Sequence, residues 1–122
     1  MATSQQHPDL PETSFVPRPY TGLSWEQVSE LRHQYLSPAL LLYYSKPIML
    51  VEGRMQYVWD DTGKRYVDAF GGIAAVSIGH CHPRVAKAVQ EQVDTIQHTT
   101  VIYLHPTTAR FAEKLASTFP AG

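Results

Sequence analysis

Between Pro47 and Pro83, short runs of β-branched and aromatic residues alternate with turn-forming residues, and this pattern strongly limits what the chain can fold into. The runs that favour strands are residues 48–52, 55–60 and 65–69. Gly53-Arg54 separates the first two runs, and residues 60–64, Asp-Asp-Thr-Gly-Lys, form a turn signal before the third. The pattern predicts a small antiparallel meander. One of its faces is expected to carry Met55, Tyr57 and Trp59.

An apolar segment bounded by glycines, residues 71–79, follows the meander. Its composition predicts a loop or an irregular strand packed against another surface. Pro83 then predicts the start of a helix, because a helix needs no N–H from its first residue, and His82 is expected to cap this helix. The apolar stripe of the helix consists of Val85, Val89, Val93 and Ile96.

Two further helices are predicted, one before the meander and one near the end of the sequence. Ser24 to Gln27 form an S-x-x-Q capping box that starts a helix over residues 25–36, and Pro38 ends it. Residues 99–104 are expected to be extended before Pro106 opens the last helix. That helix has an apolar face of Phe111, Leu115 and Phe119, and residues 119–122 end it.

Residues 1–24 are polar and rich in proline, which predicts an irregular arm with little helix or strand. Phe15 and Tyr20 predict that the second half of the arm packs against another part of the molecule. We therefore divide the chain into this arm and a folded segment over residues 25–122.

Composition excludes several classes of protein. The chain has 122 residues and a formal net charge of −1, with Lys and Arg scattered singly, which argues against nucleic-acid and anionic-membrane partners. No apolar run approaches the ~18 residues that span a bilayer. Cys81 is the single cysteine, so no intramolecular disulfide is possible. The N-terminus has no signal-peptide pattern, and Asp9 and Glu12 argue against an intact mitochondrial presequence.

His80-Cys81-His82 is the most suggestive cluster of reactive residues. Adjacent residues converge poorly on one ion, and zinc sites usually combine spaced pairs, so no metal site is predicted. A catalytic Cys and His are usually distant in sequence, which makes Cys81 a poor candidate nucleophile. A turn followed by a helix cap is the better interpretation of this tripeptide.

Carboxylates and tyrosines offer no mechanism when they are taken one by one. Asp60-Asp61 and Asp68 are possible catalytic carboxylates, but beside Thr62-Gly63 a turn is the commoner use of aspartate. The pair Tyr43-Tyr44 and the single Tyr103 favour a place in a core or an interface over substrate contact. No catalytic and no cofactor-binding residue is predicted from this chain.

The residues in combination carry a resemblance to a known family. The first block is Gly53-x-x-x-Tyr57-x-Trp59-Asp60-x-x-Gly63-x-Arg65-Tyr66-x-Asp68-x-x-Gly71-Gly72-Ile73, and the second is Gly79-His80-Cys81-His82-Pro83-x-Val85. In this order and spacing they resemble the opening of class III, pyridoxal-phosphate-dependent aminotransferases. The upstream Tyr35-Leu36-Ser37-Pro38 is typical of the alanine–glyoxylate aminotransferase 2 branch. The resemblance covers roughly residues 15 to 120.

The resemblance implies an α/β enzyme of fold type I, of which this chain supplies the N-terminal α+β part. It also implies a homodimer that uses pyridoxal phosphate to move an amino group from an amino acid such as alanine to a 2-oxo acid such as glyoxylate. The loop at Ile73 and Ala74 corresponds to a wall of the substrate pocket. Residues 99–103 correspond to a stretch near the dimer interface. Members of this branch are typically mitochondrial, although a cytoplasmic location stays open for this chain.

The same resemblance implies that this chain alone is inactive. The family's Ser-Gly-Ser-x-Ala phosphate loop does not occur, and the lysines present match non-catalytic parts of the family pattern; they are Lys46, Lys64, Lys87 and Lys114. The chain is therefore expected to stop before the large cofactor-binding domain. The alternative hypothesis is a non-catalytic interaction module that pairs with a full-length aminotransferase subunit.

Overall fold

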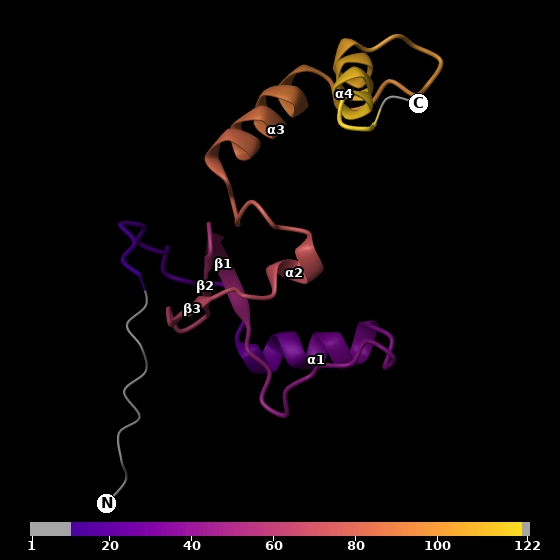
Figure 1. Ribbon diagram of the computed structural model, residues 1–122. Coiled ribbons are helices and arrows are strands. Elements are labelled where there is room, and N and C mark those ends of the chain that lie inside the picture. The colour runs from indigo at the N-terminus through magenta and orange to yellow at the C-terminus, as the bar shows by residue number, and fades with distance from the viewer. Residues whose placement is uncertain (1–10, 121–122) are drawn as a thin grey trace, which may run out of the picture. The chain divides into compact units, whose positions relative to one another are not determined.

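The computed structural model describes residues 11–120, which Figure 1 traces from indigo to yellow. The chain divides into two compact units, Met1–Pro83 and Arg84–Gly122. Within the described residues no helix has the length and apolar character needed to cross a membrane.

The first helix, α1, spans Trp25–Tyr35 and confirms the predicted capping box. The Ser24 hydroxyl accepts a hydrogen bond from the Gln27 N–H at 3.3 Å, and the Gln27 side chain accepts one from the Ser24 N–H at 2.9 Å. These two bonds satisfy N–H groups that have no partner within the helix. The Trp25 indole N–H donates to the Pro47 carbonyl at 3.1 Å, which ties the start of α1 to the chain that enters the sheet.

The predicted meander is a three-stranded antiparallel sheet in the order β1-β2-β3. Its strands are β1 at Leu50–Arg54, β2 at Tyr57–Asp60 and β3 at Arg65–Val67. All four residues of β2 are buried, and Tyr57 and Trp59 are only 2% and 3% exposed. The centre of this small core is therefore the middle strand.

The predicted break at Gly53-Arg54 is wrong, because β1 continues through both residues and pairs Gly53 with Val58. The turn instead contains Met55 and Gln56, and Met55 has a positive φ of 52°. Met55 thus lies outside β2 and not on the strand face with Tyr57 and Trp59. Glycine is needed inside β1 because a Cβ on Gly53 would lie 2.8 Å from the His80 ring.

The arm packs against the sheet, as Phe15 predicted. The Phe15 and Trp59 rings lie 5.2 Å apart, and the Tyr57 hydroxyl donates to the Pro11 carbonyl at 2.7 Å. The Arg18 guanidinium lies 3.0 Å from the Glu52 carboxylate. Residues 1–10 of the predicted arm lie outside the described residues.

The second unit contains α3, Pro83–Thr95, apart from its first residue, and α4, Pro106–Ala116. Both helices begin at the predicted prolines. Neither helix has a buried residue. The predicted end of α4 is wrong, because the helix stops at Ala116 and Phe119 lies beyond it. The segment 99–104 is also not extended, since Val101 and Ile102 form a turn preceded by Thr100 at φ 62°.

Candidate functional site

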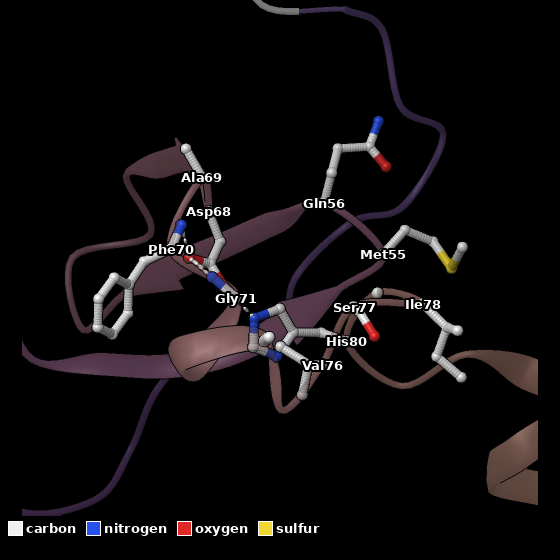
Figure 2. Close-up of a pocket in the computed structure, with 12 residues that line it drawn as sticks. Met55, Gln56, Asp68, Ala69, Phe70, Gly71, Val76, Ser77, Ile78 and His80 are labelled. Atoms are coloured by element: carbon white, nitrogen blue, oxygen red, sulfur yellow. Dashed lines mark hydrogen bonds and ion pairs between the residues drawn. The ribbon is translucent and has the colours of Figure 1, made fainter.

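A hollow of about 430 Å³ opens in the first unit, between the β1–β2 turn and the chain that follows β3. Figure 2 shows Met55 and Gln56 from the turn on one side and Val76, Ser77 and Ile78 from the loop on the other. Ala74 lines this hollow and Ile73 does not. Asp68 and His80 are the ionisable residues in its wall.

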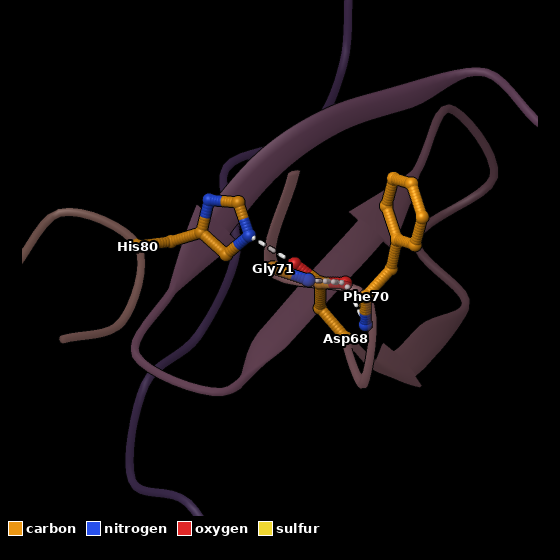
Figure 3. A network of polar contacts seen from close by, with 4 residues as sticks. All are labelled: Asp68, Phe70, Gly71 and His80. Atoms are coloured by element: carbon orange, nitrogen blue, oxygen red, sulfur yellow. Dashed lines mark hydrogen bonds and ion pairs between the residues drawn. The ribbon is translucent and has the colours of Figure 1, made fainter. Parts of the chain in front are cut away.

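Asp68 joins two parts of this wall with its two carboxylate oxygens (Figure 3). Oδ1 accepts hydrogen bonds from the N–H groups of Phe70 and Gly71 at 3.0 Å and 2.9 Å. Oδ2 lies 2.7 Å from the His80 Nε2. The His80 hydrogen bond, followed by that from the Gly71 N–H, holds the pKa of Asp68 below its ordinary value, because each favours the charged carboxylate.

The residues after Phe70 form a left-handed turn, labelled α2 in Figure 1 and spanning Gly71–Ala74. Their φ angles are 57°, 57°, 58° and 65°. Glycine adopts such angles freely, but a β-branched residue such as Ile73 is a true outlier there. The loop or irregular strand predicted for this segment is therefore wrong at its start. Gly71-Gly72 is the sequence signal that could have indicated the turn.

His80 returns the loop to the sheet. Its backbone forms two hydrogen bonds with Met55, one from the Met55 N–H to the His80 carbonyl at 2.7 Å and one in the reverse direction at 2.8 Å. The close approach requires glycine at position 79, where a Cβ would lie 2.8 Å from the Met55 Cα. Its φ of 94° also favours glycine. The His80 ring then stands over Gly53 and reaches Asp68.

Asp60 holds the turn that the sequence predicted. Its Oδ1 accepts from the Thr62 N–H, the Thr62 hydroxyl and the Lys64 N–H at 2.7 to 3.0 Å, and its Oδ2 accepts from the Tyr66 hydroxyl at 2.7 Å. Burial raises the pKa of Asp60, but these four hydrogen bonds outweigh burial and leave the pKa lowered. The same carboxylate raises the pKa of the Tyr66 hydroxyl.

The tripeptide at residues 80–82 does not act as one cluster. His80 is bound to Asp68, and Cys81 is exposed with a φ of 49°. His82 stands directly before α3, as predicted, but its buried Nδ1 has no hydrogen-bond partner and so caps no backbone N–H. Among residues 11–120 no three His, Cys, Asp or Glu side chains lie close enough together to hold a metal ion.

The three tyrosines predicted to lie in a core or an interface are all on the surface of this chain. Tyr43, Tyr44 and Tyr103 are 97%, 66% and 67% exposed. The prediction that they lie in a core is therefore wrong for this chain, and their place in an interface stays a prediction. Tyr103 lines a second hollow of about 600 Å³ in the second unit.

The residues of this chain do not fit pyridoxal phosphate. All four lysines are exposed, and none lines the hollow beside Asp68. The Lys64 ammonium lies 5.0 Å from the centre of the Tyr66 ring, and the Lys87 ammonium lies 3.7 Å from the Glu91 carboxylate. A lysine that carries this cofactor needs a desolvated pocket with a phosphate site, and the described residues form neither around a lysine.

Comparison with known proteins identifies the fold and then the family. A solved ornithine aminotransferase from Toxoplasma gondii, described with pyridoxal phosphate partly occupying its active site, matches 79% of this chain and 22% of its own. Its TM-score is 0.69 at 28% identity. The fold is thus the N-terminal part of a fold type I aminotransferase. The family Aminotransferase class-III matches residues 43–122, and the chain belongs to this family.

Two curated relatives carry the name alanine–glyoxylate aminotransferase 2. The mitochondrial homolog 2 from Arabidopsis thaliana is 47% identical over 111 residues, which are 91% of this chain and 23% of the relative. The mitochondrial human protein is 40% identical over 113 residues, 93% of this chain and 22% of the relative. The chain therefore spans less than a quarter of the length of the relatives that it matches.

Proposed function

We propose that this chain is the N-terminal segment of an aminotransferase that moves an amino group from an amino acid such as alanine to a 2-oxo acid such as glyoxylate. The identity to two relatives named for this reaction, over more than nine tenths of the chain, carries the proposal. Pyridoxal phosphate, when bound to the whole enzyme, supplies the electron sink for this chemistry. Because none of its own lysines is enclosed, the chain by itself is expected to transfer no amino group.

The contribution of this segment, in the proposal, is one apolar wall of the substrate pocket, formed by Ile73 and Ala74. The observation that supports it is the conformation of the left-handed turn. Ile73 is 81% exposed there, which leaves a large apolar side chain available to a ligand, and Ala74 lines the hollow beside Asp68. Such a wall would bind the carbon skeleton of a small amino acid and exclude water from it.

The proposal also includes a homodimer in the mitochondrion. The exposed segment around Val101 and Leu104, at 99% and 103% exposure, supports a covered position near a subunit interface in the whole enzyme. The relatives' names support the compartment.

A segment exchange tests the proposal. Residues 25–120 would replace the matching part of the Arabidopsis thaliana relative, and alanine–glyoxylate transamination would be measured against the unaltered relative. We expect kcat/KM to stay within about tenfold, because the relative retains every residue that holds the cofactor. An exchanged enzyme that binds pyridoxal phosphate normally but no longer accepts alanine would contradict the proposal.

A second measurement addresses the wall itself. In the exchanged enzyme Ile73→Ala should raise the KM for the amino acid by about tenfold with little change in kcat, since an apolar contact made equally to substrate and transition state is lost. Val67→Ala is the matched control, because Val67 is also an exposed β-branched residue but belongs to β3 and not to the left-handed turn. Equal KM and kcat values for Ile73→Ala and Val67→Ala would contradict the place of Ile73 in the substrate pocket.

A further inference from the structure

The left-handed turn at Gly71–Ala74 needs something outside itself to hold it. Gly71 and Gly72 tolerate positive φ, but Ile73 at 58° and Ala74 at 65° do not adopt such angles by preference. The turn's own hydrogen bonds are 3.2 Å from the Ile73 N–H to the Phe70 carbonyl, 3.4 Å from the Ala75 N–H to the Gly72 carbonyl and 3.1 Å from the Val76 N–H to the Gly71 carbonyl. Strained conformations of this kind persist only where the surroundings over-determine them.

Asp68 supplies the shortest contact at the start of the turn. Its Oδ1 binds the N–H groups of Phe70 and Gly71, and this fixes the direction in which the chain leaves β3. The hydrogen bond that Oδ2 accepts from the His80 Nε2 at 2.7 Å helps to hold the carboxylate in this rotamer. The Asp68 side chain is 16% exposed, so little water competes for these bonds.

His80 is a fixed partner for Asp68 because its backbone belongs to the sheet. Both of its main-chain groups are bonded to Met55, and its ring lies over the Cα of Gly53, where no other residue leaves room. A chain of contacts thus runs from Gly53 in β1 to His80 and Asp68, and Figure 3 shows its continuation from His80 through Asp68 to Phe70 and Gly71.

We propose that Asp68 and His80 are positioning residues whose hydrogen bond holds the Gly71–Ala74 turn left-handed and so presents Ile73 and Ala74 to the substrate. The last part rests on the function proposed above. His80 acts through Asp68, which in turn binds the backbone of the loop. Neither side chain is required to touch the reacting atoms.

The first test is structural and uses the complete 122-residue chain. Backbone chemical shifts and three-bond HN–Hα couplings of Ile73 and Ala74 report the sign of φ. We expect positive φ in the unaltered chain and averaging toward negative φ in Asp68→Ala and His80→Ala. Asp68→Asn should keep the turn, because its amide oxygen still accepts from Phe70 and Gly71 and its amide N–H can meet a neutral His80. His80→Gln, which keeps a donor near Asp68, should retain part of the positive φ that His80→Ala loses.

Asp61→Asn is the matched control, since Asp61 lies in the turn between β2 and β3 and lines no part of the hollow. The amide signals of Val58 and Trp59 show whether each variant retains the sheet. A left-handed turn that survives in folded His80→Ala or folded Asp68→Ala overturns the proposal. If the alanine variants lose the sheet, Asp68→Asn and His80→Gln, which keep a hydrogen bond, are compared with His80→Asn, whose shorter side chain no longer reaches Asp68. A turn that is unchanged in His80→Asn overturns the proposal.

The second test separates this inference from the function on which it rests. In the exchanged enzyme, His80→Ala should raise the KM for the amino acid by about tenfold and leave kcat nearly unchanged, as for loss of the Ile73 contact. His80→Gln should recover part of that KM. A turn that loosens without any change in KM supports the positioning role and overturns the substrate wall, whereas a turn that stays left-handed overturns the positioning role whatever the kinetics.

Discussion

The two units of this chain differ in what they bury. In the first, the arm, the sheet and the returning loop converge on β2, and all four strand residues are buried. In the second, α3 and α4 have clear apolar stripes, yet Val89, Val93 and Phe111 are 55%, 48% and 65% exposed. The first unit thus buries one whole strand with its own residues, although its helix α1 has no buried residue. The helices of the second have the pattern of packed helices without enough covering surface among the described residues.

Removing the centre of the first unit should have the largest effect. Trp59 is 3% exposed and contacts the ring of Phe15, so Trp59→Ala is expected to lower the free energy of unfolding by about 3–5 kcal/mol. Urea unfolding followed by far-ultraviolet circular dichroism would measure the loss. Val101→Ala in the second unit is the control, with an expected change within about 0.5 kcal/mol, since Val101 is 99% exposed. Equal losses of unfolding free energy in Trp59→Ala and Val101→Ala would contradict the difference between the two units.

Asp60→Ala should have the next largest effect. Four donors lose their acceptor at a site that is 8% exposed, and the expected loss is about 2–3 kcal/mol in the free energy of unfolding. Asp60→Asn should lose less, because its amide oxygen still accepts from the backbone. Thermal unfolding of both variants would test the order, and a loss in Asp60→Asn as large as in Asp60→Ala would contradict it.

Acid should weaken the first unit selectively. The pKa values of Asp60 and Asp68 are lowered in the folded chain, so each carboxylate stabilises the fold fully above the unfolded value of about 3.9 and loses that contribution as the pH falls through its lower folded pKa. The free energy of unfolding should therefore decline below about pH 4. Measured against pH, the decline should be shallower in the double variant Asp60→Asn with Asp68→Asn. An unchanged acid dependence in that variant would show that other groups govern it.

The contact between the arm and the sheet should contribute less. Arg18 and Glu52 form an ion pair at 3.0 Å, but the arginine side chain is 88% exposed, so Arg18→Ala is expected to cost about 0.2–1 kcal/mol. The loss should shrink in high salt. No loss at all would indicate that the Arg18 backbone bond to Glu52, at 2.7 Å, carries the contact, because the variant retains that bond.

The smallest effect is expected on α3. The ion pair between Lys87 and Glu91, spaced by one helical turn, is exposed at both ends, so Lys87→Ala should change stability by at most about 0.5 kcal/mol. Helicity of the chain by circular dichroism is the measurement. A large loss would mean that α3 depends on its own surface pairs more than its uncovered apolar stripe indicates.

Local signals predicted much of the fold. The capping box at Ser24 and the prolines at 83 and 106 place three helix starts correctly, because each depends only on a few neighbouring residues. The order of the sheet followed from alternating apolar runs and the Asp60 turn. The sequence pattern also identified the family, from the spacing of many residues rather than from any single one.

The errors occur where distant residues meet. The local pattern indicates a turn at Gly53, although the role of this glycine is to leave room for a ring 27 positions later in the chain. The site shows the same limit. In the sequence Asp68 is a possible carboxylate and His80 is part of a tripeptide, and their contact across 12 residues could not be predicted from either one.

The amino-acid sequence by itself determined where helices begin, that a small meander lies between them, and to which family the chain belongs. Those properties depend on hydrogen bonds and apolar spacing within a few residues. Tertiary structure alone decided the hand of the Gly71–Ala74 turn, because Ile73 and Ala74 disfavour positive φ and only contacts from Asp68 and the sheet can outweigh that preference.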